Sequence, residues 1–143
     1  MAELFDMKEL EERVILVAVS TSDEDDTEAS LDELEELADT AGATAIGRLV
    51  QNREKIHPGT YLGRGKIGEL REMVWEMGAT GVICDDELSP AQLRNLESAL
   101  DTKVMDRTMV ILDIFAAHAT TSEGKIQVEL AQLRYRAARL VGL

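Results

Sequence analysis

The chain has 143 residues, of which 45% are hydrophobic and 3% aromatic, and this predicts one soluble globular domain, with or without an appended element. Its longest unbroken apolar run, Val14 to Val19, is six residues long, far too short to span a bilayer. The single cysteine, Cys84, excludes an internal disulfide, and the acidic N-terminus lacks the basic flank of a signal peptide, so we expect a cytoplasmic protein without a membrane span.

The net charge of -13 is concentrated in the first third of the chain. Residues 1–43 carry 2 basic and 15 acidic side chains, residues 44–102 carry 7 and 9, and residues 103–143 carry 6 and 4. A strongly negative charge disfavours nucleic acid as a partner. Because the last segment is slightly basic, that objection does not extend to it.

The first part of the chain predicts two strands around a helix. Residues 13–20 are apolar without alternation, which is typical of a strand buried on both faces. Ser30 and Glu33 have the spacing of a capping box and predict a helix start, and Gly42 is expected to end that helix. A second strand is expected over residues 44–52.

The middle of the chain continues this alternation of strands and helices. A helix is expected after the turn at residues 60–66, and a buried strand over residues 81–85 follows it. Residues 89–92, Ser-Pro-Ala-Gln, are typical of a helix start, with serine as N-cap and proline in the first turn. Residues 103–106 predict a short fourth strand.

The last third, residues 106–140, predicts two antiparallel helices. Gly124 is its only glycine and lies in the polar run 118–125, where the helix is expected to break. On both sides of the break the apolar residues recur at steps of three and four, the spacing of a coiled-coil seam. The expected seam residues are Met109, Leu112, Ala116 and Ala119 before the break and Ile126, Leu130, Leu133, Ala137 and Leu140 after it.

Strands that alternate with helices make a parallel sheet with right-handed crossovers. The fold class predicted is therefore α/β: a small four-stranded parallel sheet with flanking helices, followed by an antiparallel two-helix coiled-coil hairpin. We expect an α/β subdomain at residues 1–105 and a helical hairpin subdomain at residues 106–143.

Two loops at the carboxyl ends of the expected strands could carry chemistry. Gly63, Gly65 and Lys66 precede a helix, so they could bind the phosphates of a nucleotide, or they could simply form a tight turn and helix entry. The spacing is not that of a P-loop. The acids at 85–87 could hold magnesium or act as acid and base, or could simply favour the helix start that follows. No complete catalytic site and no metal site is expected.

The hairpin carries several cations, and two interpretations of them stay open. They are Arg107, Lys125, Arg134, Arg136 and Arg139. They could be the solvated outer face of a coiled coil, paired with Asp113 or Glu129. Alternatively, they could face RNA along a rod with a polar tip.

Several motifs together resemble the HflX family of ribosome-associated GTPases. The run QVELAQLRY at residues 127–135, followed by Arg139 and Leu140, resembles that family's signature. Further runs that resemble it are TAGA at 40–43, TYLGRGK at 60–66, LSPAQLRNLE at 88–97 and DRT at 106–108 with ILDIFA at 111–116. The resemblance covers roughly residues 13–143.

The resemblance implies that the chain is the amino-terminal domain of such a protein, cut at Leu143 before a GTPase domain that is absent here. For the full-length protein it implies a GTPase that uses GTP and magnesium and splits or rescues ribosomes under stress. For this fragment it implies no catalysis and no cofactor, with the large ribosomal subunit and its RNA as partners and the missing GTPase domain as a partner in cis. The alternative is a nucleotide-binding or regulatory α/β module that controls that GTPase domain.

The resemblance also implies that the hairpin tip contacts RNA. The residues that this assigns are His118, Thr120, Thr121, Ser122, Glu123, Gly124, Lys125 and Arg134. The chain departs from the family at three of them, because His118, Thr120 and Ser122 stand where the family usually has arginine. Fewer cations predict weaker RNA binding with a flatter salt dependence.

Overall fold

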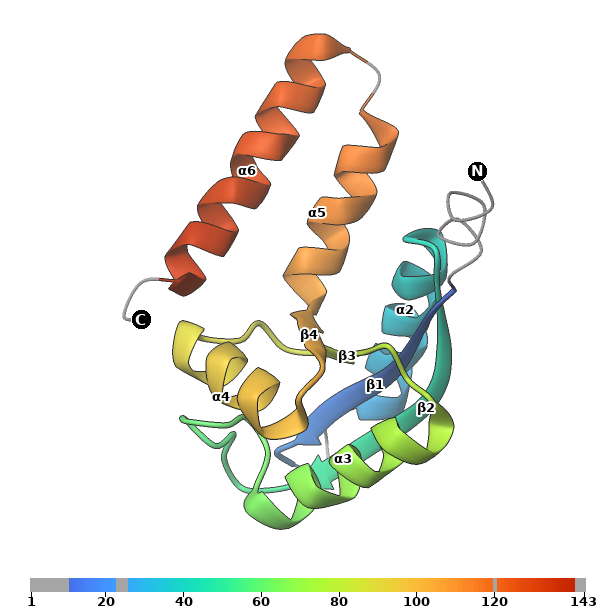
Figure 1. Cartoon of the computed structure of the whole chain (residues 1–143), viewed down its shortest axis with the longest axis vertical. Helices are drawn as coiled ribbons and strands as arrows, with labels where there is room; N and C mark the ends of the chain where they lie inside the picture. The colour runs from blue at the N-terminus through green and yellow to red at the C-terminus, as the bar shows by residue number, and fades with distance from the viewer. Residues whose placement is uncertain (1–10, 23–25, 120, 141–143) are drawn as a thin grey trace.

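The computed structural model of the chain describes residues 11–22, 26–119 and 121–140. It is an α/β fold with a parallel sheet of four strands in the order β2-β1-β3-β4 (Figure 1). The elements in chain order are β1 Glu12–Ser20, α2 Thr27–Thr40, β2 Ala43–Asn52, α3 Arg64–Met77, β3 Gly81–Cys84, α4 Pro90–Leu100, β4 Lys103–Asp106, α5 Arg107–His118 and α6 Ser122–Leu140. The predicted α/β class, the four-stranded parallel sheet with flanking helices and the order of elements are confirmed.

Strand β1 lies at the centre of the sheet and supplies both halves of the core. Val17 and its alternate neighbours pack with residues of α3 and α4, and Leu16 and its alternate neighbours pack with residues of α2 and α5. Residues 14–19 are all buried, at 8% exposed or less. A strand that is covered on both faces is apolar without alternation, which is the pattern that the sequence carries.

The order of the strands places a topological switch between β1 and β3. The chain passes from β1 to β2 on one side and returns to the other side for β3 and β4. Ligands of open α/β sheets bind at the carboxyl ends of the strands at such a point. Here that edge also carries the foot of α5, because β4 leads directly into this helix (Figure 1).

Two helix starts differ from the prediction. Helix α2 begins at Thr27, and its N-cap is Asp26, whose side chain accepts a hydrogen bond from the Ala29 amide. Ser30 is therefore not the cap, and its hydroxyl donates to Asp85 instead, at 2.6 Å. Helix α3 begins at Arg64, earlier than expected, behind the N-cap Gly63.

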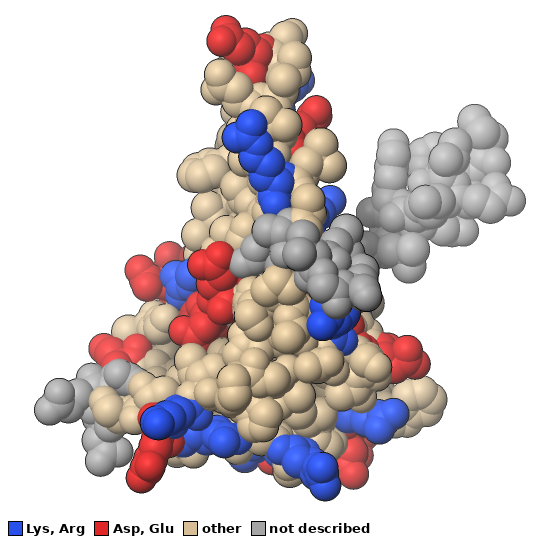
Figure 2. Space-filling view, turned by 90° about the vertical axis from the view of Figure 1, so that its left-hand side faces the viewer, with Lys and Arg blue, Asp and Glu red and all other residues tan. Residues whose placement is uncertain are grey.

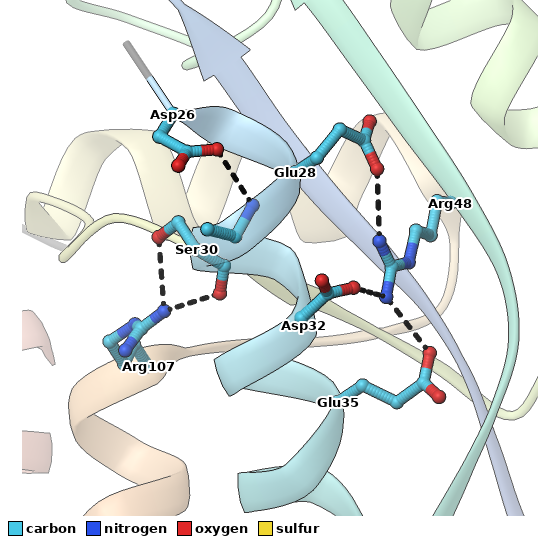
Figure 3. A network of polar contacts seen from close by, with 8 residues as sticks. Asp26, Glu28, Ser30, Asp32, Glu35, Arg48 and Arg107 are labelled. Carbon is cyan, nitrogen blue, oxygen red and sulfur yellow. Dashed lines mark hydrogen bonds and ion pairs between the residues drawn. The ribbon is translucent and has the colours of Figure 1, made fainter.

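Helix α2 carries several exposed acids, and one arginine of strand β2 neutralises part of their charge. The Arg48 guanidinium contacts Asp32 at 2.8 Å, Glu28 at 3.1 Å and Glu35 at 3.2 Å (Figure 3). Exposed ion pairs contribute little individually, but three acids around one guanidinium make a network that joins the helix to the edge strand.

No helix within the described part of the chain is both long and apolar enough to cross a membrane.

The predicted capping box of α4 is confirmed and gives a stability test. The Ser89 hydroxyl accepts from the Gln92 amide at 3.1 Å, and the Gln92 side chain accepts from the Ser89 amide at 2.9 Å. We expect Ser89→Ala to lower the free energy of unfolding by about 1 kcal/mol, measured by urea denaturation. Ser98→Ala, at an exposed position of the same helix, is the control and should cost less than about 0.5 kcal/mol. Equal costs would contradict a stabilising cap.

Candidate RNA-contacting hairpin

The hairpin is joined to the sheet through the carboxylate of Asp106, which is fully buried. Its Oδ1 accepts from the Met109 amide at 3.0 Å and so caps α5. Its Oδ2 accepts from the Leu88 amide at 2.9 Å and from the Tyr135 hydroxyl. A buried carboxylate is costly unless hydrogen bonds compensate for lost water. These three donors therefore fix β4, the loop before α4, and both helices of the hairpin relative to one another.

Arg107 makes a second junction at the foot of α5. Its Nη2 donates to Asp85 Oδ1 at 2.6 Å and to the Ser30 carbonyl at 2.9 Å, and Figure 3 shows the contact between Arg107 and Ser30. The Asp85 side chain is only 10% exposed. The first turn of α5 is therefore tied to the end of β3 and to α2.

The predicted seam is wrong for α6. Its residues Ile126, Leu130 and Leu133 are 63%, 44% and 63% exposed. The side chains that meet α5 come instead from the face with Gln132 and Tyr135: Gln132 Nε2 donates to Asp113 Oδ1 at 2.8 Å, and Tyr135 reaches Asp106.

The physical reason is the polar pairing at the interface. Because Asp106 is buried, the helix is rotated so that Tyr135 can donate to it. This rotation turns the apolar stripe of α6 away from α5. The side chain of Leu140, the last expected seam residue, lies outside the described part.

Local hydrogen bonds shape the hairpin tip. The His118 Nδ1–H donates to the Ile114 carbonyl at 2.8 Å, which satisfies a carbonyl in the last turn of α5. The Thr121 hydroxyl accepts from the Gly124 amide at 2.9 Å at the start of α6. A Cβ at Gly124 would lie 2.8 Å from that hydroxyl oxygen, so a side chain there would displace the Thr121 hydroxyl from its present position.

The tip has little positive charge. Thr121, Ser122, Glu123 and Lys125 are exposed, and Thr120 lies outside the described residues. Figure 2 shows acidic side chains at the very end of the rod, with a few basic ones further down. Lys125 and Arg134 are exposed, and neither forms an ion pair with a described residue, whereas Arg136 lies 3.8 Å from Asp113. The described tip residues, His118 and residues 121–125, thus lie together where α5 ends and α6 begins, and Arg134 lies lower on α6.

A cavity of about 380 Å³ lies at the switch point of the sheet. Its lining residues are Val19, Thr21, Asp26, Thr27, Ser30, Ile56, Asp85 and Asp86. The carboxylates expected here as acid and base have structural partners: Arg107 and Ser30 bind Asp85, and the Tyr61 hydroxyl donates to Asp86 at 2.7 Å. Burial raises the pKa of Tyr61, so it stays a donor. Among the described residues, no group of three or more histidines, cysteines or acids could hold a metal ion.

The nucleotide-binding residues predicted at the start of α3 are largely occupied by protein contacts. The Gly63 amide donates to Gln51 Oε1 at 2.7 Å, and Lys66 forms an ion pair with Glu69 at 3.0 Å. In contrast to Gly63, Gly65 is surrounded by open space, because an added Cβ there would meet nothing within 4 Å. Nucleotide binding at this loop stays a prediction.

The sequence did not predict the pairing of Asp106 with Tyr135. It also did not predict that Tyr61 is fully buried with a φ of 66°. An aspartate directly before a helix predicts a cap. Nothing in the sequence indicated that the same carboxylate would also accept from a side chain 29 positions away.

Family models match most of the chain. Residues 28–116 match a model described as GTP-binding GTPase N-terminal, and residues 118–143 match one described as GTP-binding GTPase Middle Region. A protein of Lacrimispora saccharolytica named GTPase HflX is 75% identical over the whole chain, and one of Escherichia coli with the same name is 46% identical over 96% of it. The chain spans 34% and 32% of these two proteins, about a third of their length.

Solved structures share the fold. A GTP-binding protein from the archaeon Sulfolobus solfataricus, in complex with GDP, matches 90% of this chain and 38% of its own with a TM-score of 0.67. Its sequence identity of 22% supports a likeness of fold alone.

The Asp106–Tyr135 contact gives a test of how the hairpin is held. Tyr135→Phe removes a donor from a buried carboxylate, so we expect a loss of about 1–3 kcal/mol in the free energy of unfolding. Hydrogen exchange should become faster in α6 in particular. Tyr61→Phe, which removes the comparable bond to Asp86, is the control and should leave exchange in α6 unchanged. Unaltered exchange in Tyr135→Phe would contradict this anchoring.

The orientation of α6 gives a second test. Because Leu133 is 63% exposed, we expect Leu133→Ala to cost less than about 1 kcal/mol, whereas a seam residue would cost about 2–5 kcal/mol. Leu96→Ala, at a fully buried leucine, is the reference for a large loss in the free energy of unfolding and is measured by the same urea titration. A cost for Leu133→Ala that approaches that of Leu96→Ala would restore the predicted seam.

Proposed function

Because the chain belongs to the HflX family of GTPases, we propose that it is the ribosome-binding part of such an enzyme and contacts RNA of the large subunit through the hairpin tip. The supporting observation is the anchored hairpin. Two polar junctions, at Asp106 and Arg107, hold α5 and α6 on the sheet, and α6 extends 19 residues, roughly 28 Å at 1.5 Å per residue. A fixed rod with a polar end is suited to reach into a narrow site.

The proposal assigns recognition, not catalysis, to this region. The three acids that line the cavity at the switch point, Asp26, Asp85 and Asp86, are each engaged by protein partners. Hydrolysis of GTP with magnesium would belong to the remaining two thirds of the relatives' length, as a GTPase domain acting in cis. Residues 1–105 would form the supporting α/β subdomain and residues 106–143 the hairpin subdomain. Splitting or rescue of cytoplasmic ribosomes under stress is the role we infer for the full-length protein.

The charges on the hairpin set the expected strength of binding. Lys125 is the only cation among the proposed tip residues, with Arg134 further along α6, and a nearby acid, Glu123, opposes it. Phosphate contacts from cations dominate RNA affinity and its salt dependence. The tip therefore supports weak, geometry-dependent binding rather than tight electrostatic binding.

We predict that the chain cosediments with purified large ribosomal subunits at low salt and dissociates as salt rises. Lys125→Gln should weaken binding and reduce the slope of log affinity against log salt by about 1. Lys103→Gln removes the same charge at a position paired with Glu12 in the α/β part, and should bind like the parent chain. Absence of cosedimentation at every salt concentration would refute the binding proposal.

A further inference from the structure

The loop between β2 and α3, together with the first turn of α3, is basic. Residues 53–66 contain four basic side chains and one acidic one, in a chain whose net charge is -13. This segment lies at the base of the α/β part, at the opposite end of the molecule from the hairpin tip (Figure 1). Neither interpretation of the hairpin cations, as the outer face of a coiled coil or as an RNA contact, explains the positive charge of this segment.

The loop is held in one shape by hydrogen bonds. His57 and Tyr61 bond through their backbones, at 2.9 and 3.3 Å, and the His57 Nδ1 accepts from the amides of Gly59 and Thr60. Helix α4 binds the loop from outside, since Gln92 donates to the His57 carbonyl and Asn95 to the Gly59 carbonyl. A fixed loop presents its side chains with little ordering cost on binding.

Three cations of this segment form no ion pair with a described residue. They are Arg53, which is half-buried, and Lys55 and Arg64, which are exposed. The Arg53 guanidinium lies against Gly63, where an added Cβ would be 2.7 Å from Nη1, and Gly63 directly precedes Arg64 in the chain. Helix α3 has no acidic residue in its first turn, so its positive end adds to the local potential.

The chemistry of this surface fits a phosphate backbone rather than a protein. Protein interfaces have an apolar core, but the large exposed apolar side chains of the described part lie elsewhere, at Trp75, Phe115, Ile126, Leu130 and Leu133. RNA backbones are bound by unpaired arginine and lysine on a polar surface. Figure 2 looks onto this side and shows several lysine and arginine side chains along the base, with acidic side chains among them.

We propose that Arg53, Lys55 and Arg64 form a second RNA-contacting surface that binds backbone phosphates of ribosomal RNA. It rests on the proposed function in that both require RNA as a partner, but it assigns most of the electrostatic share of binding to the base, beyond the single contact of Lys125 at the tip. The hairpin then supplies reach and orientation, and the base supplies affinity. This division explains how a chain with a cation-poor tip can still hold RNA.

The test compares two double variants with the same loss of charge. Lys55→Gln with Arg64→Gln alters the two exposed cations of the base. Arg71→Gln with Lys103→Gln is the control: Arg71 lies further along α3 beside Glu72, Glu76 and Asp101, and Lys103 is paired with Glu12. Binding to deproteinised large-subunit RNA and to whole large subunits is measured from 50 to 300 mM salt, about the range in which phosphate contacts are lost. Circular dichroism checks that each variant is folded.

The base variant is expected to bind at least about tenfold more weakly at low salt, with a slope reduced by about 2, because two phosphate contacts are lost. The control should bind like the parent chain. Equal binding by the base variant and the control overturns the second surface, and a loss confined to Lys125→Gln would then leave the proposed function standing. Failure of the parent chain to bind either target overturns both. Displacement of RNA by millimolar ATP or GTP would assign the surface to free nucleotide and overturn the RNA proposal.

Discussion

The buried carboxylate of Asp106 is the constraint on which the arrangement of this molecule depends. It lies where the last strand becomes the first helix of the hairpin, and it accepts from Met109, Leu88 and Tyr135. Each donor comes from a different element, so satisfying one buried charge fixes the direction of α5, the loop before α4 and the rotation of α6. The Arg107–Asp85 contact fixes the same junction from the other face of the sheet.

This constraint decides which face of α6 is covered. The helix has an apolar stripe at Ile126, Leu130 and Leu133 and a polar face at Gln132 and Tyr135. The polar face packs on α5, where Tyr135 donates to the buried Asp106 and Gln132 donates to Asp113. The exposed stripe forgoes the free energy of hydrophobic burial, while the buried Asp106 carboxylate gains the Tyr135 hydroxyl as a third donor.

Charge is separated along the long axis of the molecule. The acids of α2 are concentrated beside the sheet, where Arg48 neutralises some of them. The unpaired cations Arg53, Lys55 and Arg64 are at the base, and the tip carries Glu123 near Lys125. The net charge of the whole chain, -13, therefore does not predict the local charge of any one of these surfaces. An RNA partner would meet the unpaired cations of residues 53–64 at the base and a nearly neutral tip.

The sequence by itself determined the fold class, the order of the elements, the buried central strand and the capping box of α4, because each depends on local pattern: apolar runs, turn residues and cap spacing. Its long motifs also indicated the family. It did not determine the cap of α2, where Asp26 acts and Ser30 instead binds Asp85 across 55 positions. Nor did the sequence determine which face of α6 packs on α5 or that the Arg53 guanidinium lies against Gly63. It also did not determine which cations lie at the base. Those features depend on contacts between residues far apart in the chain, and only the tertiary structure brings such partners within hydrogen-bonding distance.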